Sequence, residues 1–251
     1  QQKPLIQVDF DRMSLGKFHP VDNAILGETG IVARMFSERL SEKPACSKSL
    51  KAEIAEKWEH WRAEKKRRAD IRSNKGLNPA FVFQVLGEMA PSNAIMSLDV
   101  GNSTYSFGRY FECKDNRVLL SGYLGSIGFS FPAAMGAYMA QDERPVISIS
   151  GDGGFAQYMV EFNTAVKYKM DITHVLLNNN ELAKISKEQR DGHWPVWQTL
   201  LSNPDFAQYA KACGGLGIKV QKEEELEKVL EEALAHKGPA IVEIASDPDQ
   251  T

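Results

Sequence analysis

The sequence predicts an α/β protein in which a parallel β-sheet is covered by helices on both faces. Short apolar strand-like runs alternate with helical segments from residue 76 onward, which is typical of parallel strands joined by helices. Several of these helices carry recognisable start and stop residues. Of the 251 residues, 43% are hydrophobic, enough for one or two globular domains.

Before residue 76 the pattern is less regular. Residues 4–10 and 23–26 are predicted as strands and residues 28–40 as a helix, too little for an independent domain. In the charged segment 46–75, apolar residues recur at helical spacing, which predicts an amphipathic helix resting a narrow stripe on a neighbour. This stripe consists of Leu50, Ile54, Trp58 and Trp61. The segment 46–75 also contains a run of basic residues at 65–68. Acidic residues precede this run, so we interpret it as part of a charged linker rather than as a nucleic-acid site.

The region after residue 76 supplies the elements of the sheet. Asn78 is predicted to cap a helix with Pro79 at its first position. The elements predicted after it are strands at 94–98, 146–150, 172–177 and 240–245, and helices at 129–140, 155–168, from Asn203 and Pro204 to Gly214, and at 223–236. Ligands of such sheets bind beyond the carboxyl ends of the strands, so the chemistry is expected there.

Charge and composition exclude several function classes. The chain has 30 Lys and Arg against 33 Asp and Glu, which gives no electrostatic reason to expect nucleic acid. No run approaches the ~20 apolar residues that would span a bilayer. Cys46, Cys113 and Cys213 are widely spaced and form no CxxC pair. This argues against a disulfide framework or a zinc site and for a reducing, cytoplasmic location.

The strongest chemical signal lies in residues 146–181. The run Gly151-Asp152-Gly153-Gly154 follows a strand and precedes a helix, where backbone N–H groups can receive a phosphate. It also fits the dinucleotide fingerprint, but the next strand ends in three Asn residues rather than in an acid for a ribose. The Asp152 carboxylate would repel a bare diphosphate. Because Asp152 and Asn179 follow adjacent strands and offer hard oxygen ligands, we predict a Mg²⁺-diphosphate site.

GDG followed by an Asn pair, with 27 positions from Asp152 to Asn179, resembles the signature of thiamine-diphosphate-dependent enzymes of the pyruvate oxidase, acetolactate synthase and pyruvate decarboxylase group. The resemblance covers residues 76–246 and corresponds to the family's C-terminal domain. It implies that Asp152, Asn179 and the main-chain carbonyl of Glu181 ligate Mg²⁺. It also implies that Gly153 and Gly154 approach the diphosphate through their backbone amides.

Two further stretches, DVGNS at 99–103 and GYLGSIGFSFPAAMG at 122–136, are similar to cofactor-binding segments of the same family. The resemblance implies that the Gly125 carbonyl accepts a hydrogen bond from the cofactor's 4'-amino group and that Ile127 forces its two rings into a V. In that geometry the cofactor deprotonates itself, so no catalytic residue of this chain is assigned with certainty. The complete set of implied cofactor-binding residues is Gly101, Asn102, Ser103, Gly125, Ser126, Ile127, Gly151, Asp152, Gly153, Gly154, Asn179 and Glu181.

The resemblance also implies a division of the chain. Residues 1–45 resemble the end of the family's middle domain, 46–75 form a charged helical linker, and 76–251 form the thiamine-diphosphate-binding domain. No segment resembles the pyrimidine-binding domain, which in the family contributes the Glu that protonates the aminopyrimidine ring. We therefore expect the chain alone to be inactive, and the site to be completed by that missing domain in a homodimer or homotetramer.

Within the family, the stretches DVGNSTYSFGRYF and LAKISKEQ look more like pyruvate oxidases than acetolactate synthases. The implied reaction is decarboxylation of a 2-oxo acid, pyruvate in first place, after which the enamine passes electrons to a flavin. FAD in the full-length enzyme rests on resemblance only. Three alternatives stay open: an acetolactate synthase-like carboligase, a non-catalytic thiamine-diphosphate-binding module and a dinucleotide-binding oxidoreductase. Residues 181–202, which could cover the substrate, are predicted as a surface loop with partly buried tryptophans.

Overall fold

The structure is a computed structural model that describes residues 3–40, 48–140 and 143–250. It divides into two compact units, Gln1–Trp61 and Arg62–Thr251, and the helix α2 (Lys48–Ala69) crosses the boundary between them. The division into parts ending at residues 45 and 75 therefore stays a prediction. Cys46, one of the three cysteines, lies outside the described residues.

The first unit contains a parallel pair of strands and a helix. β1 (Ile6–Asp9) pairs with β2 (Asn23–Leu26), and α1 (Thr29–Leu40) follows. None of the described residues up to Trp61 is buried. In the predicted stripe of α2, Leu50, Ile54 and Trp58 are exposed, and the ring centre of Trp58 lies 5.3 Å from that of Trp61 in an edge-to-face contact. The described part of this unit thus has no core of its own.

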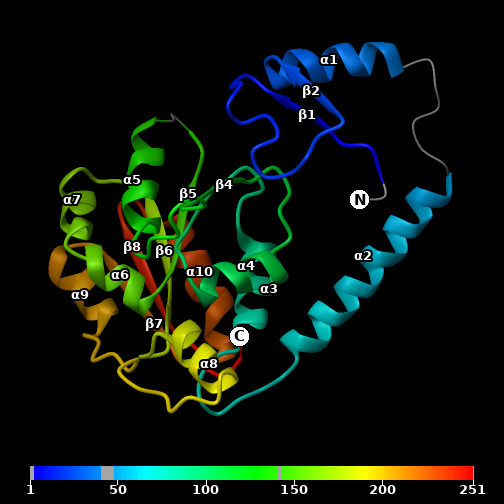
Figure 1. Ribbon diagram of the computed structural model, residues 1–251. Helices are drawn as coiled ribbons and strands as arrows, with labels where there is room; N and C mark the ends of the chain where they lie inside the picture. Colours follow the sequence, from blue (N-terminus) through cyan, green and yellow to red (C-terminus); the bar gives the residue numbers. More distant parts are fainter. Residues whose placement is uncertain (1–2, 41–47, 141–142, 251) are drawn as a thin grey trace. The chain divides into compact units, whose positions relative to one another are not determined.

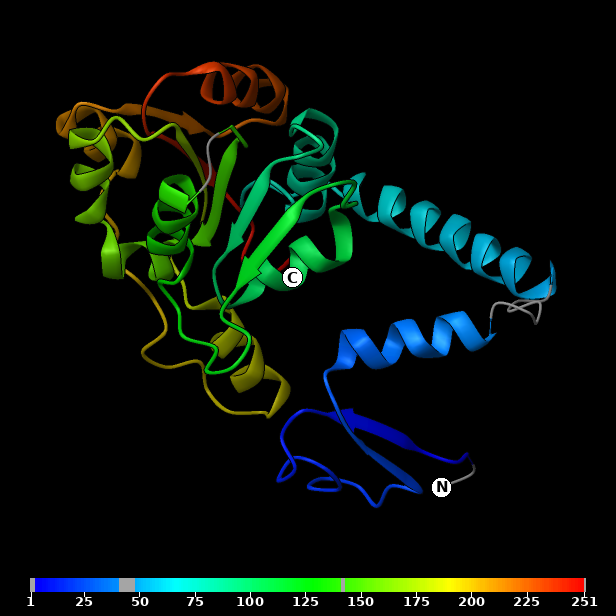
Figure 2. The same cartoon turned by 90° about the horizontal axis from the view of Figure 1, so that it is seen from above.

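The second unit is built on a six-stranded parallel sheet with the strand order β4-β3-β5-β6-β8-β7, seen in Figures 1 and 2. This confirms the predicted fold class. The strands are β3 (Ile95–Leu98), β4 (Arg117–Leu120), β5 (Val146–Gly151), β6 (Ile172–Asn178), β7 (Leu216–Val220) and β8 (Ala240–Ala245).

Helices cover both faces of this sheet. The core on one face includes α3 (Pro79–Met89), α4 (Asn102–Tyr110) and α10 (Glu223–Ala235). The core on the other includes α5 (Ser130–Ala140), α6 (Asp152–Tyr158), α7 (Glu161–Lys167) and α9 (Phe206–Cys213). Along β5, Ile147 belongs to the first core and Val146 to the second, which explains why the strand is buried on both faces from Val146 to Ser150. In the described part of the chain, no helix is both long and apolar enough to cross a membrane.

Several elements differ from the sequence prediction. The predicted helix at 155–168 is two helices, and the first of them already begins at Asp152. The predicted cap at Asn203 is wrong, because Asp205 caps α9 by accepting a hydrogen bond from the Gln208 N–H at 2.8 Å. The cap of α3 is confirmed, since Asn78 accepts from the Ala80 N–H at 2.9 Å. The sequence prediction lacked α4, β4, β7 and α8 (Ala183–Asp191).

A neutral histidine lies inside the core. His174, on β6, is fully buried between the rings of Phe131 and Phe155. Its two ring nitrogens lie 3.0 Å from the Ser148 hydroxyl and 3.1 Å from the Ser150 hydroxyl. Burial lowers the pKa of His174 from 6.5 to about 3.

This burial predicts a loss of stability in mild acid. Below pH 6.5 the unfolded chain binds a proton at His174 that the folded chain excludes, so the free energy of unfolding falls as pH drops toward 3. Between pH 7 and pH 5 we expect His174 to account for a loss of roughly 2 kcal/mol. Urea titrations at both pH values should give a smaller loss for His174→Gln, which cannot titrate there. An equal loss in both proteins would contradict the prediction.

Candidate functional site

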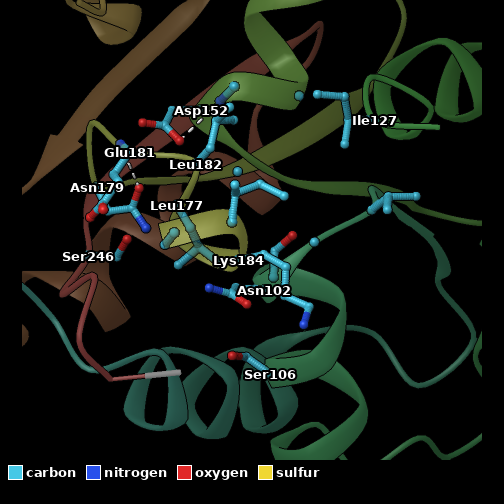
Figure 3. A pocket seen from close by; sticks show the side chains of 18 of the residues that line it. Asn102, Ser106, Ile127, Asp152, Leu177, Asn179, Glu181, Leu182, Lys184 and Ser246 are labelled. Carbon is cyan, nitrogen blue, oxygen red and sulfur yellow. Dashed lines mark hydrogen bonds between the residues drawn. The ribbon is translucent and has the colours of Figure 1, made fainter. Parts of the chain in front are cut away.

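The carboxyl ends of β3, β5, β6 and β8 open onto one cavity of about 330 Å³, shown in Figure 3. Residues from several segments far apart in sequence line it, and they include every residue predicted to bind the cofactor except Ser126. The Ser126 N–H instead donates to the Ser121 hydroxyl at 3.3 Å. The fold therefore brings together the motifs that the sequence pointed to, at the edge of the sheet where ligands of parallel sheets bind.

Asp152 is a buried carboxylate at the wall of this cavity. Only 2% of it is exposed, and burial raises the pKa of its carboxyl above the usual value. Hydrogen bonds from Asn203 at 2.7 Å and from the Gly153 N–H at 3.0 Å lower the pKa by less. A carboxylate buried in this way is stabilised by a bound cation.

Asn179 lies at the same end of the cavity as Asp152 in Figure 3, as expected from the pairing of Gly151 with Leu177 in β5 and β6. Its side-chain oxygen accepts a hydrogen bond from the Glu181 N–H at 3.1 Å. The Glu181 carboxylate is 3.2 Å from the Arg190 guanidinium, so this side chain already has a counter-charge. The ligand that the resemblance implies here is the main-chain carbonyl of Glu181, which this ion pair does not involve.

The opposite wall offers backbone N–H groups. Helix α4 begins directly after Gly101, so the N–H groups of Asn102 and Ser103 belong to the first turn, which has no intrahelical acceptors. Gly101 has φ of 124°, and an added Cβ would find nothing within 4 Å. A glycine therefore keeps the backbone accessible here.

A residue that the sequence analysis did not single out, Asp99, joins two of the cavity segments. Only 1% of Asp99 is exposed, at the end of β3. One carboxylate oxygen accepts from the Gly128 N–H at 2.8 Å, and the other from the Ser130 N–H at 3.1 Å and the Ser130 hydroxyl at 3.0 Å. Asp99 thus fixes the loop that carries Gly125 and Ile127. Its position directly after a predicted strand was the available signal.

The segment 181–202 is not the predicted loop with partly buried tryptophans. It contains α8, and Trp194 and Trp197 are each 71% exposed. From α8, Lys184 lines the cavity, and its ammonium lies 5.4 Å from the ring centre of Tyr105. It also forms an ion pair with Glu188 at 2.5 Å. Helix α8 therefore forms part of the cavity wall.

Comparison with known proteins identifies the family. The model described as thiamine pyrophosphate enzyme, C-terminal TPP binding domain, matches residues 99–244, which is more than half of the chain. The chain belongs to this thiamine pyrophosphate enzyme family. The match includes every residue predicted to bind the cofactor.

Three curated relatives give further detail. A "putative thiamine pyrophosphate-containing protein YdaP" of Bacillus subtilis is 34% identical over 96% of this chain and 42% of its own length. The acetolactate synthase isozyme 3 large subunit of Escherichia coli is 31% identical over 92% of this chain and 41% of its own length. The mitochondrial acetolactate synthase catalytic subunit of Saccharomyces cerevisiae is 31% identical over 68% of this chain and 26% of its own length. The chain thus spans less than half of each relative. Two of these three relatives are named acetolactate synthases, and none of the three is named a pyruvate oxidase.

The residues present fit a Mg²⁺ ion and the diphosphate of this family's cofactor. The Asn102 amide nitrogen is buried at the cavity and has no hydrogen-bond partner in the part of the chain that the structure describes. An anionic oxygen would satisfy this donor. Among the described residues, no cluster of three or more His, Cys, Asp or Glu side chains could hold a metal alone. The predicted site needs no such cluster, since it draws on one carboxylate, one amide and one main-chain carbonyl.

Proposed function

We propose that the chain is the diphosphate-binding part of a Mg²⁺- and thiamine-diphosphate-dependent carboligase that acts on a 2-oxo acid such as pyruvate, in the manner of acetolactate synthase. The observation that carries the proposal is the cavity in which Asp152, Asn179 and the glycine-rich segment 151–154 meet. Membership of the thiamine pyrophosphate enzyme family supports the cofactor, and the acetolactate synthases among the relatives support the reaction.

In this proposal the cation is held by Asp152, Asn179 and the main-chain carbonyl of Glu181. The positive ion offsets the repulsion between the Asp152 carboxylate and a diphosphate. The backbone N–H groups of Gly154 and Asn102 would bind the phosphate oxygens, since the Gly153 N–H already donates to Asp152. The donors of the cavity wall are fixed by secondary structure, so little ordering is needed when the ligand binds.

The remaining wall residues would orient the cofactor and exclude water. Thiamine diphosphate supplies the electron sink for decarboxylation when it is bound. Gly125 has φ of 65° and a Cβ there would find open space, so its backbone can lie close to a ligand. Apolar side chains of Val100, Leu177 and Leu182 also line the cavity and lower its polarity. A pyrimidine-binding part from outside this chain, in a homodimer or homotetramer, would complete the site.

The test uses the complete enzyme that carries this chain. With pyruvate, Mg²⁺ and thiamine diphosphate we expect acetolactate and CO₂, and chelation of Mg²⁺ should stop the reaction. The 251-residue chain alone should give no product. Cofactor binding without turnover by the complete protein would instead indicate a non-catalytic binding module.

A pyruvate oxidase-like activity is the second candidate. The stretches DVGNSTYSFGRYF and LAKISKEQ favour it, and they contribute α4 and α8 to the cavity wall. In that case the complete enzyme would contain a flavin and reduce an electron acceptor with pyruvate. Reduction of the acceptor without acetolactate would replace the first proposal by this one.

A further inference from the structure

Glu243 is a buried carboxylate on β8 that does not line the cavity. Only 1% of it is exposed. One oxygen accepts hydrogen bonds from the Asn178 amide at 2.9 Å and from the Lys219 ammonium at 3.3 Å. The other accepts from the Ala207 N–H in the first turn of α9 at 2.9 Å. The energy cost of burying this charge is thus offset by three donors.

Asn178, the last residue of β6, is held in one orientation by this carboxylate. Its NH₂ group donates to Glu243, so its carbonyl oxygen faces the other way. That oxygen accepts from the Asn203 NH₂ group at 3.1 Å and from the Asn180 N–H at 3.2 Å. If the NH₂ group and the oxygen of the Asn178 side chain were exchanged, the NH₂ group would face these two donors and both hydrogen bonds would be lost. The Glu243 carboxylate therefore fixes the orientation of the Asn178 amide.

Asn203 forms the last link. Its NH₂ group donates to the Asp152 carboxylate at 2.7 Å, to the Asn178 oxygen at 3.1 Å and to the Asn180 side-chain oxygen at 3.2 Å. All three contacts require a donor, so the Asn203 amide has one favourable orientation. Its short bond to Asp152 in turn fixes the rotation of that carboxyl group. A continuous chain of hydrogen bonds thus runs from Glu243 through two amides to Asp152.

We propose that Glu243 is a positioning residue for the Asp152 carboxylate and acts through Asn178 and Asn203. The inference rests on the proposed Mg²⁺ site at Asp152 and Asn179. Glu243 touches neither the ion nor the cofactor in this scheme, but it determines how well Asp152 is oriented to bind the ion. Groups that orient a metal ligand in this way typically change metal affinity by about 10–100-fold when they are removed.

A purely structural role makes a different prediction. Glu243 also binds the first turn of α9, so its loss could simply loosen that helix. Asp205→Ala is the matched control, because it removes the side-chain cap of α9 and an ion pair with Lys219, but none of the hydrogen bonds that link Glu243 to Asp152 through Asn178 and Asn203. Asn178→Ala is the complementary variant, because it breaks the chain but keeps the bond between Glu243 and α9.

The experiment measures Mg²⁺ affinity by calorimetry at saturating thiamine diphosphate, together with thermal stability without Mg²⁺. We expect Glu243→Gln and Asn178→Ala to weaken Mg²⁺ binding about tenfold or more, and excess Mg²⁺ to restore thiamine diphosphate binding. Asp205→Ala should lower stability but stay within about twofold of the wild-type Mg²⁺ affinity.

Two results would overturn the inference: wild-type Mg²⁺ affinity in a folded Asn178→Ala variant, or an equal loss of affinity in Asp205→Ala. If Glu243→Gln fails to fold, Asn178→Ala decides alone. Failure of the complete wild-type enzyme to bind Mg²⁺ and thiamine diphosphate would reject the proposed function itself, and is therefore distinguishable from failure of the positioning role.

Discussion

Asp152→Ala should abolish Mg²⁺-dependent binding of thiamine diphosphate while the chain stays folded. Asp152 is the only carboxylate among the three proposed protein ligands, and without it the cation loses its one charged protein ligand. Since groups that merely orient a ligand change affinity by about 10–100-fold, loss of the ligand itself should cost more than about 100-fold. Calorimetry with Mg²⁺ and thiamine diphosphate measures this directly.

The stability of this variant should change little. Burial raises the pKa of Asp152, which means that the charged side chain is held at a desolvation cost in the absence of a cation. Removing it relieves that cost and at the same time leaves the Asn203 amide with one acceptor fewer. Asp171→Ala is the control, because this half-buried acid precedes β6 at the opposite end of the strand and binds the Gly238 N–H. Unchanged cofactor affinity in Asp152→Ala would remove Asp152 from the site.

The sequence could predict that Asp152 and Asn179 share one cavity, because each follows directly after a strand. GDG and the Asn run lie at the ends of β5 and β6, and parallel pairing necessarily brings those ends together. The supporting residues could not be found in this way. Asn203 binds Asp152 across 51 positions, and Glu243 binds Asn178 across 65. Such contacts depend on the packing of α9 and β8, which no local pattern encodes.

Two errors of the sequence analysis have local causes. Glycine has a low helix propensity, so Gly153 and Gly154 suggested a loop, whereas α6 includes both. Packing overrides propensity at this point, because Gly154 is buried against Asp99. Asn203 and Asp205 are both typical capping residues, and the sequence does not tell which one caps α9. Asp205 does so, and Asn203 is thereby available to bind Asp152.

Gly154→Ala should damage stability and cofactor binding together. A Cβ at this position would lie 2.8 Å from an oxygen of the Asp99 carboxylate and 2.9 Å from its carbon, closer than such atoms can approach. The carboxylate cannot withdraw, because hydrogen bonds from Val100, Gly128 and Ser130 hold both of its oxygens. Either the start of α6 or the loop carrying Gly125 must therefore move, and both belong to the cavity.

We expect Gly154→Ala to lower the free energy of unfolding by about 1–3 kcal/mol, the usual cost of overpacking a buried site. Thiamine diphosphate affinity should fall tenfold or more, by loss of about 1.4 kcal/mol of binding free energy. Gly136→Ala is the matched control: this exposed glycine lies within α5, where a Cβ meets nothing within 4 Å. It should raise stability by about 0.4–1 kcal/mol and leave affinity unchanged, because alanine restricts the unfolded chain. Equal behaviour of the two variants would mean that the contact between Gly154 and Asp99 does not hold the cavity in shape.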